Sequence, residues 1–155
     1  MDIISLTVLS AAFALGETIP AKYTCSGANI SPPLSWGEVP AGTQSIAVLS
    51  DDPDCPGGWV HWVLFNLPPE TKELPEGIAP TPRLPDGSIQ GITDFRRPGY
   101  GGPCPPPGKP HRYYFRVYAL DRKLDLAPRA TMDDVVKAMK GRILAQGETM
   151  GRFGR

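Results

Sequence analysis

The only two histidines of the chain, His61 and His111, each follow a loop rich in glycine and proline. The stretch "DDPDCPGG" precedes the first, and "GGPCPPPGKP" precedes the second. An imidazole has an ordinary pKa of about 6.5, so it can exchange a proton near neutral pH and attract an anion when it is charged. These two positions are therefore the first candidates for binding chemistry.

Further polar side chains are expected near these histidines. In "HRYYF", His111 and Tyr113 share one face of the expected strand, because side chains alternate along a strand. Asp52 and Asp54 stand at the end of another apolar run. If the three loops converge at one end of a sheet, these side chains and His61 form a small polar pocket.

The glycines of the second loop add backbone donors to that pocket. Gly101 and Gly102 have no side chains, so their N–H groups can approach a ligand closely. Backbone N–H, tyrosine O–H and histidine N–H groups all donate hydrogen bonds, and such a concavity favours phosphate or carboxylate. The neighbouring prolines hold the loop in one shape, which lowers the ordering cost of binding. The predicted ligand is a small anion or a phosphorylated group.

Other interpretations of the same residues stay open. A single histidine at a strand start is more often structural than functional, and Asp before Pro is a common turn former. Asp52 with His61 would permit general acid–base work, as in a weak hydrolase. Cys55 or Cys104 with a histidine would permit nucleophilic catalysis, but no nucleophile motif such as GxSxG is present. We therefore expect no enzyme and no cofactor.

Three apolar runs are expected to be the strands that position these residues. They are rich in β-branched and aromatic residues and cover residues 45–50, 59–67 and 111–120. Between the last two, residues 68–110 are expected to be mainly loop, with one short strand near 88–92.

The C-terminal part has a helical pattern. Thr131 and Asp134 resemble a capping box, and Val135, Met139 and Ile143 recur at four-residue spacing. This predicts a helix that ends near Gly147. Strands first and a helix last favour a mostly-β domain with a peripheral helix.

Length and composition limit the function classes. The 155 residues suit a single domain over residues 1–155, and 16 basic against 16 acidic residues show no nucleic-acid footprint. There are 19 prolines and 17 glycines, but an apolar fraction of 41% argues for a folded chain with stiffened loops. The apolar N-terminal stretch lacks a positive leader and is too short to span a membrane, so it is expected to be the first strand and turn of a cytoplasmic protein.

The three cysteines, Cys25, Cys55 and Cys104, form no CxxC pair, which makes a zinc site or a thioredoxin-type motif improbable. An odd number in a reducing compartment usually means free thiols. A bridge between two of them stays open as an alternative.

Several motifs together resemble one family. The stretches "DDPDCP", "WVHWVLFNLP" and "GPCPPPGKPHRYYFRVYAL" look like the phosphatidylethanolamine-binding protein family, also called the Raf kinase inhibitor protein family. The opening "AFALGETIPAKYTCSGANISPPLSW" and the ending "LAQGETMGRFGR" resemble its bacterial and archaeal branch. The resemblance covers essentially the whole chain.

This resemblance implies a large central antiparallel sheet packed on a smaller sheet, with peripheral helices and an anion pocket at one end of the large sheet. By motif position, it implies that the pocket residues are Asp52, Asp54, His61, Gly102, Pro103, His111 and Tyr113. It also implies that Cys25 and Cys104 lie close enough for a disulfide. Cys55 stands where the family usually has a small residue, which puts a thiol at the pocket rim.

Function follows the resemblance in outline. It implies a non-catalytic protein that binds phosphate or phosphorylated head groups, with homodimers in some members. Some relatives inhibit kinases or serine proteases, so a protein inhibitor that acts through its loops is the alternative.

Overall fold

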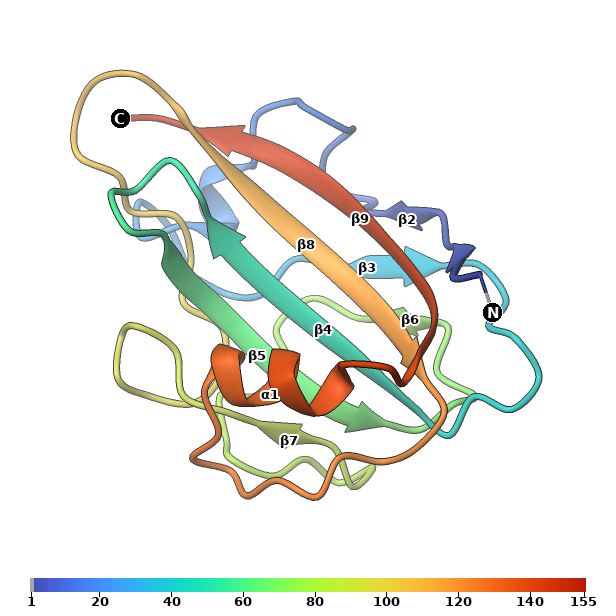
Figure 1. Ribbon diagram of the computed structural model, residues 1–155. Helices are drawn as coiled ribbons and strands as arrows, with labels where there is room; N and C mark the ends of the chain where they lie inside the picture. Colours follow the sequence, from blue (N-terminus) through green and yellow to red (C-terminus); the bar gives the residue numbers. More distant parts are fainter. Residues whose placement is uncertain (1) are drawn as a thin grey trace.

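Two β-sheets make up most of the molecule, whose computed structural model describes residues 2–155 (Figure 1). The large sheet has the strand order β1-β9-β8-β4-β5-β7, and the small sheet has the order β2-β3-β6. The strands are β1 (Ile4–Ser5), β2 (Val8–Leu9), β3 (Leu34–Trp36), β4 (Ser45–Asp52), β5 (Trp59–Leu67), β6 (Glu73–Leu74), β7 (Ile89–Gln90), β8 (His111–Leu120) and β9 (Ile143–Phe153). One α-helix, α1 (Met132–Met139), and one 3-10 turn, η1 (Ala21–Tyr23), complete the described elements.

The three central strands are those that the sequence predicted. β4, β5 and β8 carry runs of β-branched and aromatic residues, and nearly every residue of β4 is buried on both faces of the sheet. Such residues pack well on a pleated surface that is covered on both sides. The predicted short strand at 88–92 corresponds to β7, which pairs with β5 through Leu64 and Phe65.

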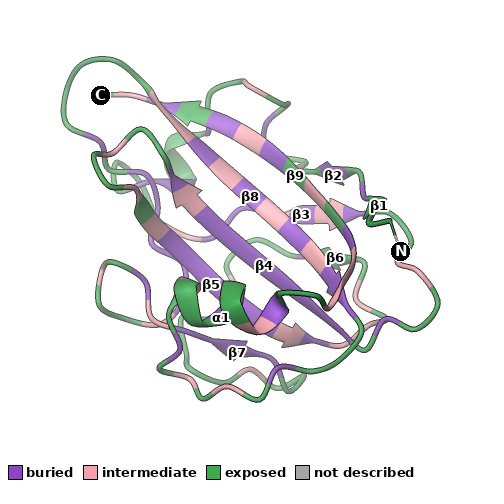
Figure 2. Cartoon of the chain, viewed as in Figure 1, coloured by how far each residue is buried: buried purple, intermediate pink, exposed green. Residues whose placement is uncertain are grey.

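Each face of the large sheet supports its own apolar core (Figure 2). One core lies between the two sheets and includes Phe115 and Val117 of β8 with Trp36 of β3. The other lies under α1 and includes Leu49 of β4 and Val135 of the helix. The alternation of side chains along each strand divides the residues between these two cores.

The C-terminal prediction was wrong beyond the first helical turns. Thr131 does form the predicted capping box with Asp134, but α1 ends at Met139, and Gly141 adopts a positive φ of 77°. Ile143 then begins β9, which pairs with β8 over its length. Gly147 does not end a helix. It lies in β9 beside the chain that follows β1, and a Cβ there would overlap the backbone of Leu6.

The large sheet is mixed, whereas the family resemblance implied an antiparallel sheet. The exception is β1, which pairs in parallel with β9 through Ile4 and Ser5. No helix within residues 2–155 is long and apolar enough to cross a membrane.

The order of the central strands brings three chain segments to one end of the sheet. β4 lies between β5 and β8 and is antiparallel to both. Asp52 at the end of β4 is therefore opposite Trp59 at the start of β5, and Asp51 is opposite Tyr114 near the start of β8. The loops at this end gather at the left of Figure 1.

Candidate functional site

A cavity of about 230 Å³ opens at this end of the large sheet. It is lined by Asp52, Cys55, Trp59, His61, Phe95, Cys104, Pro105, Pro106, His111 and Tyr113. These residues come from β4, β5 and β8, from the loop between β4 and β5, and from the long loop between β7 and β8. The convergence predicted from the sequence is therefore a property of the fold.

Asp52 is the organising carboxylate of the cavity. Its side chain is only 4% exposed, and Oδ2 lies 2.6 Å from Nδ1 of His111. Its other oxygen, Oδ1, accepts hydrogen bonds from the backbone N–H groups of Asp54 and Cys55. All of these contacts hold Asp52 in place, so it orients the His111 ring and anchors the turn after β4.

His61 is held from the opposite side of the cavity. Its Nδ1 lies 2.6 Å from the carbonyl oxygen of Gly101, and the Gly101 N–H donates in return to the His61 carbonyl at 2.9 Å. The residue is 3% exposed, and this burial lowers its pKa below the ordinary value. His61 is therefore a largely neutral imidazole at neutral pH.

Tyr113 lies between the two histidines. Its ring packs edge-on against His61 at 5.2 Å between centroids and is stacked near His111 at 6.5 Å. Burial and the carboxylate of Asp52 raise the pKa of Tyr113, so its hydroxyl keeps its proton. The hydroxyl lies within interaction range of the Asp52 carboxylate, and because Tyr113 lines the cavity the hydroxyl can donate to a ligand there.

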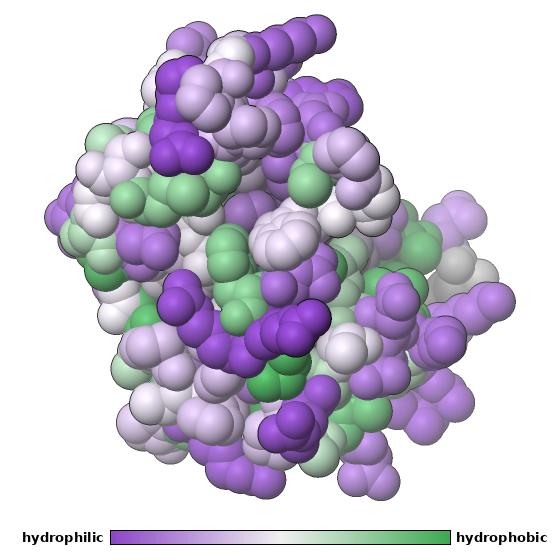
Figure 3. Space-filling view, turned by 90° about the vertical axis from the view of Figure 1, so that its left-hand side faces the viewer, coloured by the Kyte–Doolittle hydropathy of each residue, from purple (hydrophilic) through white to green (hydrophobic). Residues whose placement is uncertain are grey.

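The remaining lining is largely apolar. Trp59 is 36% exposed and packs edge-on against Phe95, and Pro105 and Pro106 lie in the loop opposite. Cys55 contributes a free thiol. Figure 3 views the molecule from this side, where hydrophobic residues are interspersed with hydrophilic ones. The cavity therefore combines a polar floor with an apolar rim.

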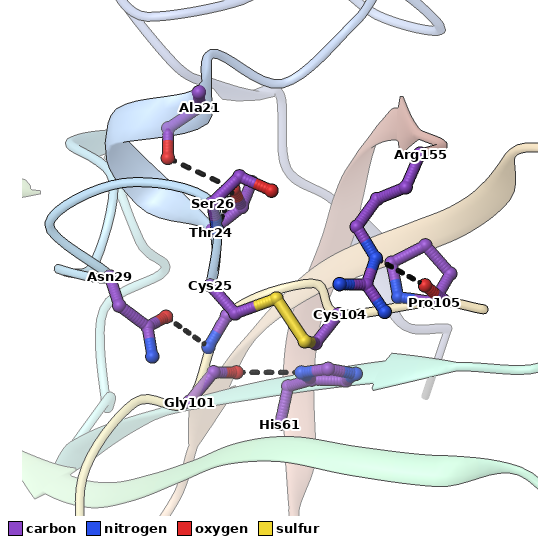
Figure 4. The surroundings of a disulfide bond; sticks show 11 residues. Ala21, Thr24, Cys25, Ser26, Asn29, His61, Gly101, Cys104, Pro105 and Arg155 are labelled. Carbon is purple, nitrogen blue, oxygen red and sulfur yellow. Dashed lines mark hydrogen bonds between the residues drawn. A yellow bond between two sulfur atoms is a disulfide. The ribbon is translucent and has the colours of Figure 1, made fainter. Parts of the chain in front are cut away.

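The loop that carries the rim is cross-linked to the N-terminal part of the chain (Figure 4). Cys25 and Cys104 form a disulfide, and the Cys25 N–H donates to the carbonyl of Pro103. On the other side, Arg155 donates from Nε to the carbonyl of Pro105 at 2.6 Å. The glycine- and proline-rich loop therefore forms one wall of the cavity and is held in place on two sides.

Four of the seven predicted site residues line the cavity: Asp52, His61, His111 and Tyr113. Asp54 does not; its carboxylate accepts three hydrogen bonds from Arg112, which hold the pKa of Asp54 at about 2. Gly102 and Pro103 do not line the cavity either.

The donor role expected for Gly102 does not hold. Its N–H already donates to Oδ1 of Asn29 at 2.8 Å, and a Cβ at this position would overlap the carbonyl of Tyr23. The glycine is required for close packing against the N-terminal segment. The polar groups that line the cavity come from side chains.

Sequence reasoning missed the apolar rim. Trp59 belongs to an apolar run that predicted only a strand, and Phe95 stands in a loop whose sequence has no periodicity to reveal its orientation. The one available signal was the position of Trp59 at the very start of a strand that also carries His61. Within residues 2–155, no group of three or more His, Cys, Asp or Glu side chains is arranged to hold a metal ion.

A comparison of sequences finds one family over nearly the whole chain. The family model described as phosphatidylethanolamine-binding protein matches residues 9–154. A UPF0098 protein of Methanothermobacter thermautotrophicus is 52% identical over 138 residues, which are 88% of this chain and 91% of that protein. A UPF0098 protein of Aquifex aeolicus is 47% identical over 153 residues, covering 97% and 89% of the two chains.

Solved structures give the same result. The structure of a putative homolog of this family from Chlamydia trachomatis has a TM-score of 0.88 and 38% identity, covering 97% of this chain and 98% of that one. YbcL of E. coli, described as a new member of the mammalian family, has a TM-score of 0.89 and 35% identity with the same coverage.

Proposed function

The chain belongs to the phosphatidylethanolamine-binding protein family, and from this premise we propose that it binds a small anion, of the phosphate or phosphorylated head-group type, without catalysing its conversion. The observation that carries the proposal is the convergence of His61 from β5 and of His111 and Tyr113 from β8 on one cavity. The Tyr113 hydroxyl and Nε2 of His61 belong to residues that are 1% and 3% exposed, and both residues line the cavity.

Polar atoms that border a cavity can form hydrogen bonds with a ligand that enters it, each worth about 1 kcal/mol and more when the ligand is charged. The Nε2 atom of His111 is a third candidate contact, because Asp52 occupies the other nitrogen of that ring. An imidazole nitrogen can donate to a ligand oxygen or accept from a ligand hydroxyl, according to where the ring hydrogen lies.

The shape of the cavity supports a small polar group with an apolar substituent. A volume of about 230 Å³ holds a phosphate with a few further atoms. The polar floor would take the phosphate oxygens, and the Trp59–Phe95 side would contact the substituent.

Catalysis is not part of this proposal. The Asp52–His111 pair could activate a nucleophile, but Asp52 is already engaged by two backbone N–H groups. Inhibition of a protease or kinase is not favoured by a specific observation either. A carboxypeptidase Y inhibitor shares the fold with a TM-score of 0.53, but at 19% identity this likeness carries no activity to this chain.

Titration calorimetry with inorganic phosphate at pH 6 tests the proposal. Tyr113→Phe removes the hydroxyl with little change in shape, and we expect phosphate affinity to fall about tenfold, the loss of one good hydrogen bond. The matched control is Tyr114→Phe, the same change on the next residue, whose ring faces the other side of β8 against Arg116.

The two variants separate the outcomes. Equal affinity in both would contradict the assignment of Tyr113 to the site. Absence of phosphate binding by the unchanged protein, at concentrations up to tens of millimolar, would contradict the proposed function itself.

A further inference from the structure

The hydrogen position on His61 is decided by its surroundings. Nδ1 lies 2.6 Å from the Gly101 carbonyl oxygen, which can only accept a hydrogen bond. The ring hydrogen of the neutral imidazole must therefore sit on Nδ1. The other nitrogen, Nε2, is then a bare acceptor.

The acceptor that fixes this tautomer cannot move away. The Gly101 N–H bonds back to the His61 carbonyl, so the two residues hold each other through both backbone and side chain. Gly101 also packs so closely on the Phe95 ring that a Cβ would overlap it. The adjoining loop is fixed by the disulfide at Cys104. The tautomer is consequently built into the fold.

The charged groups around His61 do not reverse this state. Asp52 and Asp51 of β4 and Asp94 of the loop after β7 favour its protonated form, but the cost of burial outweighs them and lowers the pKa. From β8, Tyr113 contributes only a neutral hydroxyl. The cavity therefore contains one ring nitrogen, Nε2 of His61, that accepts a hydrogen bond and does not donate one.

We propose that the cavity takes its anion with a hydrogen attached, donated by the ligand's own P–O–H group to Nε2 of His61. This inference rests on the proposed function. It identifies the ligand class as a phosphomonoester, or phosphate itself, bound as the singly charged form. Phosphodiesters have no such hydrogen and are disfavoured.

The other contacts complete the ligand's hydrogen bonding. The Tyr113 O–H donates to a second phosphate oxygen, and Nε2 of His111 is placed for a third contact because Asp52 holds Nδ1 of that ring. A diester can satisfy His61 only if the imidazole first takes a proton from solvent, against its lowered pKa. The two ligand classes therefore differ by one proton taken up on binding.

Ethyl phosphate and dimethyl phosphate give a sharp comparison, because they are isomers and both carry one negative charge at pH 5.5, below the monoester's second pKa of about 6. Titration calorimetry in two buffers of different ionisation enthalpy measures the protons taken up. We expect ethyl phosphate to bind at least tenfold more tightly. We also expect binding of dimethyl phosphate to take up more protons than binding of ethyl phosphate. Inorganic phosphate, as a third arm, shows whether the free ion or an ester is the better ligand.

Each outcome decides something different. Equal affinities with equal proton uptake overturn the inference and leave anion binding standing. Tighter binding of the diester does the same. Failure of all three ligands to bind overturns the proposed function, and the inference with it.

A variant and a direct measurement add independent tests. His61→Gln presents an amide that both donates and accepts, so the ratio of ester to diester affinity should fall towards one. If that variant does not fold, the ¹⁵N chemical shifts of the His61 ring in the unchanged protein still decide. A pyridine-type Nε2 at pH 5.5 supports the inference, and a protonated Nε2 in the free protein overturns it.

Discussion

The two faces of β8 near its start differ in how fully their polar groups are paired. On the outer face, Arg112 donates three hydrogen bonds to Asp54, and Arg116 forms ion pairs with Asp51 and Glu148. The ring of Tyr114 lies between the two guanidinium groups, at 5.8 Å and 4.7 Å from its centroid.

On the inner face, the polar groups surround a cavity instead. His61, His111 and Tyr113 all line it. Asp52 lines it too, but both of its oxygens are engaged. The polar groups of the outer face are paired with one another, whereas those of the inner face border a space that a ligand can enter. The outer face needs nothing further.

The largest effect is expected from the disulfide, whose Cys104 lines the cavity on the inner side. Replacing Cys25 and Cys104 together by Ser opens a cross-link between residues 79 apart in sequence, and chain entropy predicts a loss of about 4 kcal/mol in the free energy of unfolding. Urea denaturation measures this loss. Cys55→Ser is the control, since that thiol lines the cavity but is free. Equal losses in the two variants would show that the cross-link is not the cause.

Asp52→Ala is expected to come next, at about 3 kcal/mol, because it leaves two backbone N–H groups and His111 without their buried partner. Asp54→Ala, two residues away on the outer face, removes an ion pair whose side chains are 40% and 30% exposed and should cost much less. Thermal unfolding of both variants compares them. A larger loss for the Asp54 variant would reverse the contrast drawn between the faces.

The stability of the protein in acid should depend on the Asp54–Arg112 ion pair of the outer face. The folded pKa of Asp54 is about 2, below its ordinary 3.8, so its ion pair with Arg112 stabilises the fold above pH 4 and is lost as the pH falls towards 2. We expect Asp54→Asn to flatten the decline of stability between pH 4 and pH 2. Urea midpoints at several pH values in this window measure it, and an unchanged slope would contradict the assignment.

The smallest effect is expected at the edge of the outer network. Glu148 is 52% exposed and lies 3.3 Å from Nε of Arg116, which retains Asp51 as a partner. Glu148→Gln should therefore change the free energy of unfolding by less than about 0.5 kcal/mol and leave phosphate affinity unchanged. A clear loss of phosphate binding would mean that the two faces are coupled.

Much of the fold was predictable because its signals are local. The strands of residues 59–67 and 111–120 follow from uninterrupted aromatic and β-branched runs, and parity along the second places His111 and Tyr113 on one face. The error at the C-terminus has an equally physical origin. Val135, Met139 and Ile143 fit a helical stripe, but the pairing of β9 with β8 and the turn at Gly141 decide against it.

Site membership was only partly predictable for a related reason. A motif states which residues are near one another, but not which of their atoms are already used. Gly102 lies in the predicted loop, yet its N–H is taken by Asn29, 73 residues away. Asp54 stands beside Asp52 but points to Arg112. Such competition between partners is settled by packing.

The sequence by itself determined the central strands, their inward and outward faces and the family, because these depend on the order of residue types along the chain. The tertiary structure alone decided which donors and acceptors meet. It set Nδ1 of His61 against the Gly101 carbonyl, engaged both oxygens of Asp52, and placed Tyr113 in the wall of the cavity. A hydrogen bond requires its donor and acceptor to be placed within a few tenths of an ångström of the right distance. When the two segments are far apart in sequence, only the folded chain fixes that distance.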